Sequence, residues 1–280
     1  MHPFLTCPDA AFGKTACRLG LASRGSSALE PDVVLEAIDR GVNFLNWPGE
    51  SEGSPGVDAF AQAIASLGRM RDSVVVCTQL AARTATDAHR ELRSVLATLK
   101  TDYLDVATLY YVERPDEWES LLAPGSALRY CRQAKADGLI RRIGLTSHQR
   151  PLAAVAARGG LLDLLMIRYN AAHRGAETEI FPVTDALKMP VIAYTALRWG
   201  ALLRSTPDDP PDFQVPSAAG WYRFVLQSPS VAVVLAAPSN RRELAEDLHV
   251  LSSTGPLDLA TFERLAAHGL RVRRHAGRFP

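Results

Sequence analysis

Short apolar runs alternate with segments of helical periodicity along most of the chain. The apolar runs are rich in β-branched residues, and we expect buried strands at residues 18–22, 42–45, 74–78, 103–110, 142–146, 164–169, 191–194 and 231–236. Apolar residues recur at helical spacing over residues 30–40, 57–67, 88–99, 126–137, 151–158, 180–187, 218–226, 241–250 and 262–274. Residues 1–17 are expected to be irregular or to form a small hairpin, and residues 205–214 to form a surface loop.

This alternation predicts an α/β fold with a parallel sheet, because helices between apolar strands carry the chain back across the sheet. About eight such units within 280 residues favour a closed (β/α)8 TIM barrel over an open sheet. No GxGxxG motif follows the first expected strand, which argues against a Rossmann domain. Neither a repeat nor a domain boundary stands out, so we expect a single (β/α)8 barrel domain over residues 1–280.

Composition and charge exclude several other classes of protein. The 31 Lys and Arg residues nearly balance the 30 Asp and Glu residues, so we expect neither nucleic acid nor an anionic membrane as a partner. The N-terminus lacks a signal peptide and no apolar run could cross a bilayer, which together predict a cytoplasmic protein. The scattered cysteines predict separate buried thiols rather than a disulfide or a metal site: Cys7, Cys17, Cys77 and Cys131.

The stretch at residues 41–53, GVNFLNWPGESEG, is where we expect the chemistry. Its apolar residues predict a short strand that ends before Asn46, and a polar loop follows. Residues just past the carboxyl end of a barrel strand face the ligand. Glu50 and Glu52 in this loop are candidates for acid or base function, with plain exposure to solvent as the alternative.

Five segments resemble the aldo-keto reductase family and occur in the order and spacing of that family. They are LATLKTDYLDVATLY (96–110), ADGLIRRIGLTSH (136–148), LLDLLMIRYN (161–170), VIAYTALRWGALL (191–203) and VVLAAPSNRRELAEDL (233–248). The resemblance covers roughly residues 12–248 and implies a (β/α)8 barrel, an N-terminal hairpin over its bottom and NADP(H) across its top. It also implies hydride transfer to the carbonyl carbon of a small-molecule substrate and proton transfer to its oxygen.

The resemblance locates four catalytic positions of the family, and this chain departs from the family at all of them. The aspartate, tyrosine, lysine and histidine positions correspond to Asn46, Ser51, Gln79 and Tyr110, respectively. A buried lysine without its aspartate would be an unpaired charge that lowers stability by about 3–5 kcal/mol. Replacement of both residues by neutral amides avoids this cost. Asn46 and Gln79 are candidates for a mutual hydrogen bond, and Tyr110 keeps a phenol that could donate a proton.

The implied cofactor positions are better retained. The resemblance assigns Tyr194 to the nicotinamide ring, and Thr146 and Ser147 to its carboxamide. It assigns Thr195 and Leu197 to the pyrophosphate, and Ser239 and Arg242 to the adenosine phosphate. Met166 stands where the family has a glutamine. We expect Ser239 to cap the following helix, and Arg241 and Arg242 to meet a 2′-phosphate or simply face water.

Two other features do not follow from the resemblance. His148 lies next to an implied cofactor position and is a candidate acid or base, with a hydrogen-bonded loop imidazole as the alternative. Arg168, in a segment that continues to His173, would bind a carboxylate or an oxyanion if it points into the barrel. Arg24, in contrast, is assigned through the resemblance: it follows the first strand and either covers the diphosphate or faces water.

Three functions agree with these residues. The first is an aldo-keto reductase-like oxidoreductase that binds NADP(H) and acts on a small carbonyl or related substrate by a non-standard mechanism. The second is a lyase, cyclase or isomerase on the same barrel that uses His148, Tyr110 or Glu50. The third is a catalytically silent binding or regulatory barrel. NADP(H) is the expected cofactor, with loss of its binding as the alternative. The sequence leaves the substrate and the oligomeric state open.

Overall fold

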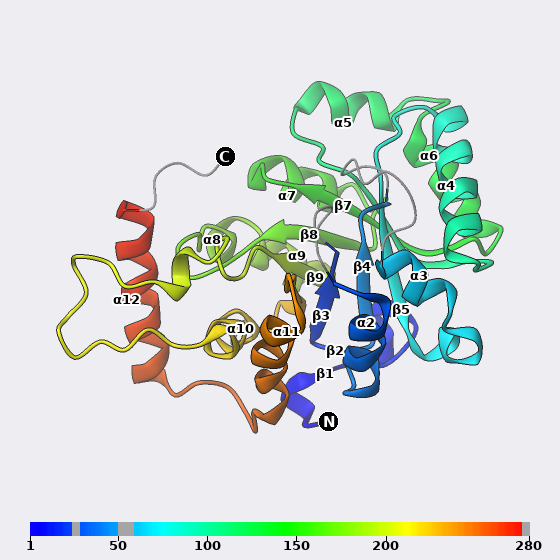
Figure 1. The fold of residues 1–280 in the computed structure, drawn as a ribbon. Coiled ribbons are helices and arrows are strands. Elements are labelled where there is room, and N and C mark those ends of the chain that lie inside the picture. The colour runs from blue at the N-terminus through cyan, green and yellow to red at the C-terminus, as the bar shows by residue number, and fades with distance from the viewer. Residues whose placement is uncertain (24–28, 50–58, 276–280) are drawn as a thin grey trace.

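Eight parallel strands form a closed barrel in the computed structural model, which describes residues 1–23, 29–49 and 59–275. The order around the barrel is β10-β3-β4-β5-β6-β7-β8-β9 (Figure 1). The strands are β3 (Leu19–Ala22), β4 (Phe44–Trp47), β5 (Val75–Leu80), β6 (Leu104–Leu109), β7 (Ile140–Ser147), β8 (Leu164–Arg168), β9 (Val191–Tyr194) and β10 (Val231–Ala236). The expected (β/α)8 barrel is therefore confirmed.

Helices surround the barrel on its outside (Figure 1). Their bounds are α2 (Pro31–Asp39), α3 (Ala59–Ala65), α4 (Ala85–Leu99), α5 (Pro115–Leu122), α6 (Ala127–Ala136), α7 (Arg150–Arg158), α8 (Ala176–Glu179), α9 (Phe181–Leu187), α10 (Ala218–Leu226), α11 (Arg241–Leu248) and α12 (Leu259–His275). The sequence pattern did not indicate α5. This helix begins with Pro115, and the Glu117 carboxylate accepts the backbone N–H of Arg114 at its start.

An N-terminal hairpin closes one end of the barrel, as expected. Its strands β1 (Thr6–Cys7) and β2 (Ala16–Cys17) pair antiparallel around the short helix α1 (Asp9–Phe12). The Phe12 ring packs edge-on against Phe44 of β4, with ring centroids 5.1 Å apart. The hairpin thus plugs the barrel interior with a buried aromatic side chain. The four cysteines are buried and free, which confirms the expectation for them.

A buried ionic cluster ties the hairpin to the barrel at this end. Asp105 is fully buried, and its carboxylate lies 2.8 Å from Lys14 Nζ, 2.8 Å from Arg71 Nη1 and 3.3 Å from Arg141 Nη1. The Tyr103 ring faces the guanidinium carbons of Arg71 and Arg141, 4.1 and 4.0 Å from its centroid. Each of the three cations lies within ion-pair distance of the Asp105 carboxylate, so we interpret this cluster as structural.

Strand β4 extends further than the sequence pattern indicated. Asn46 lies within it, paired with Ala22 of β3 and Cys77 of β5, rather than beyond its end.

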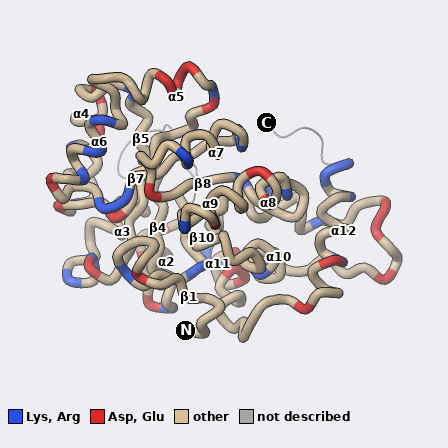
Figure 2. The backbone as a smooth tube through the Cα atoms, turned by 180° about the vertical axis from the view of Figure 1, so that it is seen from behind, with Lys and Arg blue, Asp and Glu red and all other residues tan. Residues whose placement is uncertain are grey.

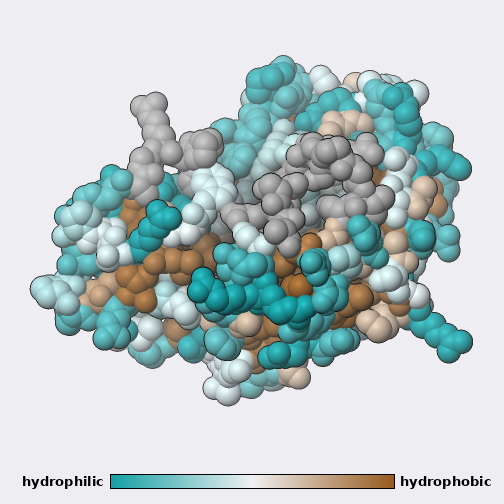
Figure 3. All heavy atoms as spheres, in the orientation of Figure 1, coloured by the Kyte–Doolittle hydropathy of each residue, from teal (hydrophilic) through white to brown (hydrophobic). Residues whose placement is uncertain are grey.

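Basic and acidic residues are interspersed along the backbone in Figure 2, in line with the net charge of +1. The face seen in Figure 3 mixes hydrophilic and hydrophobic residues. Within the described ranges, no helix combines the length and hydropathy needed to cross a bilayer.

Candidate active site

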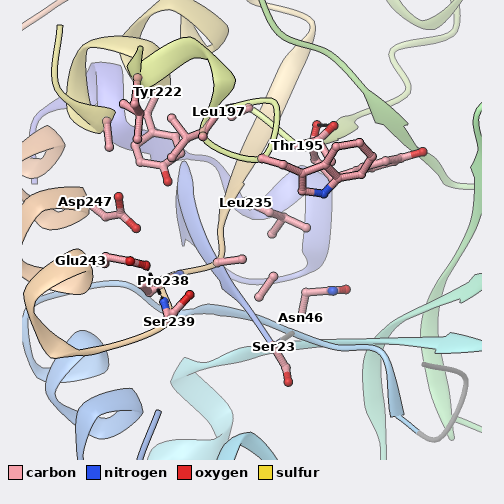
Figure 4. Close-up of a pocket in the computed structure, with 18 of the residues that line it drawn as sticks. Ser23, Asn46, Thr195, Leu197, Tyr222, Leu235, Pro238, Ser239, Glu243 and Asp247 are labelled. Atoms are coloured by element: carbon pink, nitrogen blue, oxygen red, sulfur yellow. Dashed lines mark hydrogen bonds between the residues drawn. The ribbon is translucent and has the colours of Figure 1, made fainter. Parts of the chain in front are cut away.

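A cavity of about 870 Å³ lies at the carboxyl ends of the barrel strands and reaches to the start of α11. This is the end of a (β/α)8 barrel where active sites are built. Most residues singled out from the sequence line the cavity: Asn46, Gln79, Thr146, His148, Tyr194, Thr195, Leu197, Ser239 and Arg242. Tyr110 and Ser147 are not among its lining residues. Figure 4 shows Asn46 at one end and Glu243 and Asp247 at the other.

The inner end of the cavity carries two amide side chains whose carbonyl oxygens lack hydrogen-bond donors among the described residues. Asn46 and Gln79 are only 4% and 7% exposed. The Gln79 Nε2 atom donates to the Met166 sulfur at 3.5 Å. Among the described residues, neither Asn46 Oδ1 nor Gln79 Oε1 has a hydrogen-bond partner. The mutual hydrogen bond considered from the sequence is not formed, because Asn46 pairs with Cys77 while Gln79 lies two residues further on and reaches across to β8.

Aromatic rings form one wall of the cavity, and Tyr111 rather than its neighbour Tyr110 belongs to the lining. Tyr111 lines the cavity, and its ring stacks on His148 with centroids 4.5 Å apart. Tyr110 packs against Tyr111 at 4.3 Å. Tyr194 completes the wall, 6.4 Å from Tyr111 and 5.7 Å from His148. Two consecutive tyrosines at the end of a strand indicate an aromatic wall. The alternation of side-chain directions along a strand does not continue past its end, so the sequence could not show which of the two tyrosines faces the cavity.

His148 is held by Glu113, a residue that the sequence did not single out. The Glu113 Oε1 atom accepts the backbone N–H of His148 at 2.8 Å and lies 3.3 Å from its Nδ1 atom. Burial lowers the pKa of His148 below its ordinary value, while the negative charge of Glu113 opposes this shift. A neutral imidazole beside a carboxylate can take up a proton, so this pair can act as an acid or a base.

Hydroxyl groups of the neighbouring strands are mostly engaged within the protein. Thr146 Oγ1 donates to Thr108 Oγ1 at 3.1 Å, and Ser147 Oγ donates to the Val112 carbonyl at 2.7 Å. The Tyr194 hydroxyl donates to the Ser147 carbonyl at 3.4 Å, and burial raises the pKa of Tyr194 well above its ordinary value. Tyr194 therefore stays a neutral phenol whose ring face is available to a flat ligand.

The segment after β9 forms a strained turn along the cavity. Thr195, Arg198 and Trp199 have positive φ angles of 54°, 48° and 51°, which non-glycine residues rarely adopt. Asn170 supports the turn, because its Nδ2 atom donates to the Thr195 carbonyl at 2.9 Å. Trp199 lines the cavity and is 49% exposed. Such strain persists only where the surroundings hold it and is often found at ligand sites.

The outer end of the cavity lies at the start of α11, where two expectations need correction. Asn240, not Ser239, caps the helix, because its Oδ1 atom accepts the Glu243 N–H at 3.0 Å. Arg241 turns away to α2, where it forms ion pairs with Asp32, at 2.6 Å, and with Glu36. Arg242 is left as the cation that lines this end.

Acidic residues accompany Arg242 at the outer end. Asp247 is 4% exposed, and burial raises its pKa to about 7, with the Glu243 and Glu246 charges acting in the same direction. A hydrogen bond from the Tyr222 hydroxyl partly opposes this shift. The outer end thus changes its charge near neutral pH.

The remaining sequence candidates lie elsewhere. Arg24, Glu50, Ser51 and Glu52 are outside the described residues. Arg168 is the last residue of β8 and does not line the cavity. Its positive charge contributes to the lowered pKa of His148. Burial is the main cause that lowers the pKa of His173 to about 4, and the charge of Arg168 adds to it. Within the described part of the chain, no group of three or more His, Cys, Asp or Glu residues could hold a metal ion.

Comparison with known proteins identifies relatives of one kind. The model of the aldo/keto reductase family matches residues 32–219. D-threo-aldose 1-dehydrogenase of Pseudomonas sp is 29% identical over 106 residues, and this match spans 37% of the present chain and only 32% of that relative.

Three solved structures are similar over nearly the whole chain. An aldo-keto reductase from Bacillus halodurans in its holo form has a TM-score of 0.75 at 17% identity and covers 90% of this chain and 92% of its own. An aldo/keto reductase from Klebsiella pneumoniae in complex with NADP and acetate has a TM-score of 0.73 at 20% identity, covering 94% and 95%. The glycerol dehydrogenase of Gluconobacter oxydans has a TM-score of 0.70 at 18% identity, covering 96% and 97%. At these identities the similarity establishes the fold.

Proposed function

This chain belongs to the aldo-keto reductase family, and we propose that it is an oxidoreductase that binds NADP(H) and acts on a small carbonyl compound or a related substrate. One observation carries the proposal: a single cavity joins the amide side chains at the strand ends to the start of α11. Asn46 and Gln79 occupy positions where the family has an aspartate and a lysine, so proton transfer must use another group. The proposed mechanism is therefore non-standard.

The residues along the cavity fit a nicotinamide dinucleotide. The Tyr194 ring offers a flat face for the nicotinamide, with Thr146 beside it. The turn that begins at Thr195 would border the pyrophosphate, and Ser239 and Arg242 would meet the adenosine phosphates. When bound, this cofactor supplies a hydride to the substrate carbon or removes one from it. That the Klebsiella pneumoniae relative is a complex with NADP supports this assignment.

His148 is the group we propose for proton transfer. It lines the cavity and is restrained by Glu113 on one side and by the Tyr111 ring on its face. Its imidazole would take the proton of an alcohol during oxidation, and the imidazolium would return a proton to the carbonyl oxygen during reduction. Glu113 would orient the ring and stabilise its charged form.

Titration with NADPH tests the proposal. Trp199 lines the cavity, so we expect saturable quenching of its fluorescence, and the Trp199→Phe variant should remove most of this signal. Absence of binding at about 1 mM cofactor, an upper level for ordinary enzyme affinities, would refute NADP(H) dependence. Binding without cofactor turnover over a panel of small aldehydes, ketones and alcohols would favour a catalytically silent barrel instead.

A further inference from the structure

The inner end of the cavity combines unsatisfied acceptor oxygens with aromatic faces. Asn46 Oδ1 and Gln79 Oε1 are buried and lack hydrogen-bond partners among the described residues. The contact between Gln79 Nε2 and the Met166 sulfur fixes which side of that amide presents its oxygen. The rings of Tyr111, His148 and Tyr194 form the adjoining wall of the same cavity. Buried acceptors without donors are costly, so this end is prepared for a ligand that brings donors.

Fixed positive charge is absent from the described residues that line this end. Arg242 is the only Lys or Arg among the described lining residues, and it belongs to the opposite end, beside Glu243 and Asp247. His148 has a lowered pKa and is mostly neutral at neutral pH. Arg168 does not line the cavity, but its positive charge acts on His148 and Tyr194, and the carboxylate of Glu113 partly offsets it. A cationic ligand would therefore meet dipoles and ring faces in the lining, with the opposite charges of Glu113 and Arg168 near it.

We propose that this end of the cavity binds an organic cation that carries N–H groups, namely a protonated imine substrate or the protonated form of its amine product. A C=NH2+ group or a secondary ammonium has two N–H donors, one for Asn46 Oδ1 and one for Gln79 Oε1, whereas a cyclic iminium such as protonated 1-pyrroline has a single N–H for one of them. In the cofactor-free protein, the Tyr194 ring would add cation–π attraction. A lysine at residue 79 would repel such a ligand, whereas a neutral glutamine accepts it.

The inference rests on the proposed function for its redox step. A dihydronicotinamide gives a hydride to the iminium carbon, and the electron pair of the C=N π bond moves onto nitrogen. The cation and the hydride yield a neutral amine, so this step needs no proton donor. The exchange of Asn46 and Gln79 for the family's charged pair is then compatible with catalysis, because the iminium nitrogen arrives already protonated.

Binding to the cofactor-free protein is the first test, with pyrrolidinium as the probe and cyclopentanol as a neutral ligand of the same ring size. We expect calorimetry to show pyrrolidinium binding at least about tenfold tighter than cyclopentanol. Gln79→Met keeps the side-chain length but removes the acceptor, and should weaken pyrrolidinium binding about tenfold. Gln79→Lys should abolish it. Gln133→Met on the exposed face of α6 is the matched control and should bind as the wild type does.

The Gln79→Met variant should fold, because it removes a buried oxygen that has no partner. Equal affinity for cyclopentanol and pyrrolidinium, or an unchanged affinity in Gln79→Met, would overturn the cation site. Turnover with NADPH separates the two proposals: we expect 1-pyrroline to be reduced faster than cyclopentanone, and His148→Gln to raise the ratio of these rates. Pyrrolidinium binding without any NADPH oxidation would refute the proposed function and the redox step that rests on it, and would leave the cation site standing. Reduction of cyclopentanone but not of 1-pyrroline would refute the imine inference alone.

Discussion

One carboxylate oxygen of Glu113 contacts His148 twice, at its backbone N–H (2.8 Å) and at its Nδ1 atom (3.3 Å). The first contact fixes the backbone at the end of β7, and the second fixes the ring. The Tyr111 ring stacked on the imidazole restrains it from the face. Orientation of a proton-transfer group by a carboxylate recurs in unrelated enzymes. The geometry makes Glu113 a positioning residue for the proposed reaction.

Glu113→Gln should therefore lower kcat about 10- to 100-fold while leaving the affinity for NADPH unchanged. Glutamine cannot stabilise the imidazolium by charge, so the pKa of His148 should fall further below its already lowered value. The pH at which reduction begins to decline should consequently move to lower pH. Glu119→Gln, on the exposed side of α5, is the matched control. A normal kcat with an unshifted pH profile in Glu113→Gln would exclude this role.

Replacement of Arg242 and of Arg241 by alanine should affect different properties, namely cofactor affinity and folding stability, respectively. Arg242→Ala should weaken NADPH binding about fivefold, or about 1 kcal/mol, because this exposed cation would contact only the 2′-phosphate. NADH affinity should hardly change. Arg241→Ala should instead lower stability by less than about 1 kcal/mol through its pairs with Asp32 and Glu36, and should keep normal NADPH affinity. Fluorescence titration and denaturant unfolding of both variants provide the check, and equal losses for NADPH and NADH would contradict the assignment.

The barrel could be predicted from the sequence because each strand is an almost continuous apolar run followed by a helix-forming segment. The helix α5 escaped prediction, since its signal lies in Pro115 and the capping Glu117 rather than in apolar periodicity. The free cysteines were likewise predictable from composition and spacing, whereas the N-terminal hairpin was one of two alternatives in the pattern and followed from the family resemblance.

The candidate site was predicted only in outline. Position along the strands placed Asn46 and Gln79 at the cavity, but not the direction of their amides, which depends on Met166 across the barrel. Glu113 follows β6 in a loop, and nothing in its local sequence indicates that it reaches His148. Arg241 and Arg242 are adjacent and identical, and only packing against α2 distinguishes them. Contacts between distant segments decided each of these cases.

Asp247 should make the protein less stable as pH rises from about 4 to about 7. Its pKa is raised from 3.8 to about 7 in the folded state, so the folded protein holds a proton over this range that the unfolded chain has lost. The loss amounts to up to about 4 kcal/mol. Asp247→Asn should raise the unfolding free energy at pH 8 and have little effect at pH 4. Glu263→Gln, on the exposed face of α12, is the control, and an unaltered pH dependence in Asp247→Asn would refute the prediction.

The buried cluster at the opposite end of the barrel makes the largest stability prediction. Asp105 faces the charges of Lys14, Arg71 and Arg141, and its side chain is fully buried. Asp105→Asn would leave these cations together without their counter-charge, which should cost about 3–5 kcal/mol. The exposed pair of Arg114 and Asp116 offers a comparison, because both side chains are more than half exposed.

Asp116→Asn should leave the stability nearly unchanged, since water already screens that pair. Unfolding in urea at constant pH would measure both values. Similar costs for the two substitutions would mean that water reaches Asp105 and that its pairs contribute little. A large cost confined to Asp105→Asn would show that the N-terminal hairpin depends on this carboxylate, because Lys14 reaches it from the segment that leads into β2. The ionic cluster would then hold the barrel closed at the end opposite its cavity.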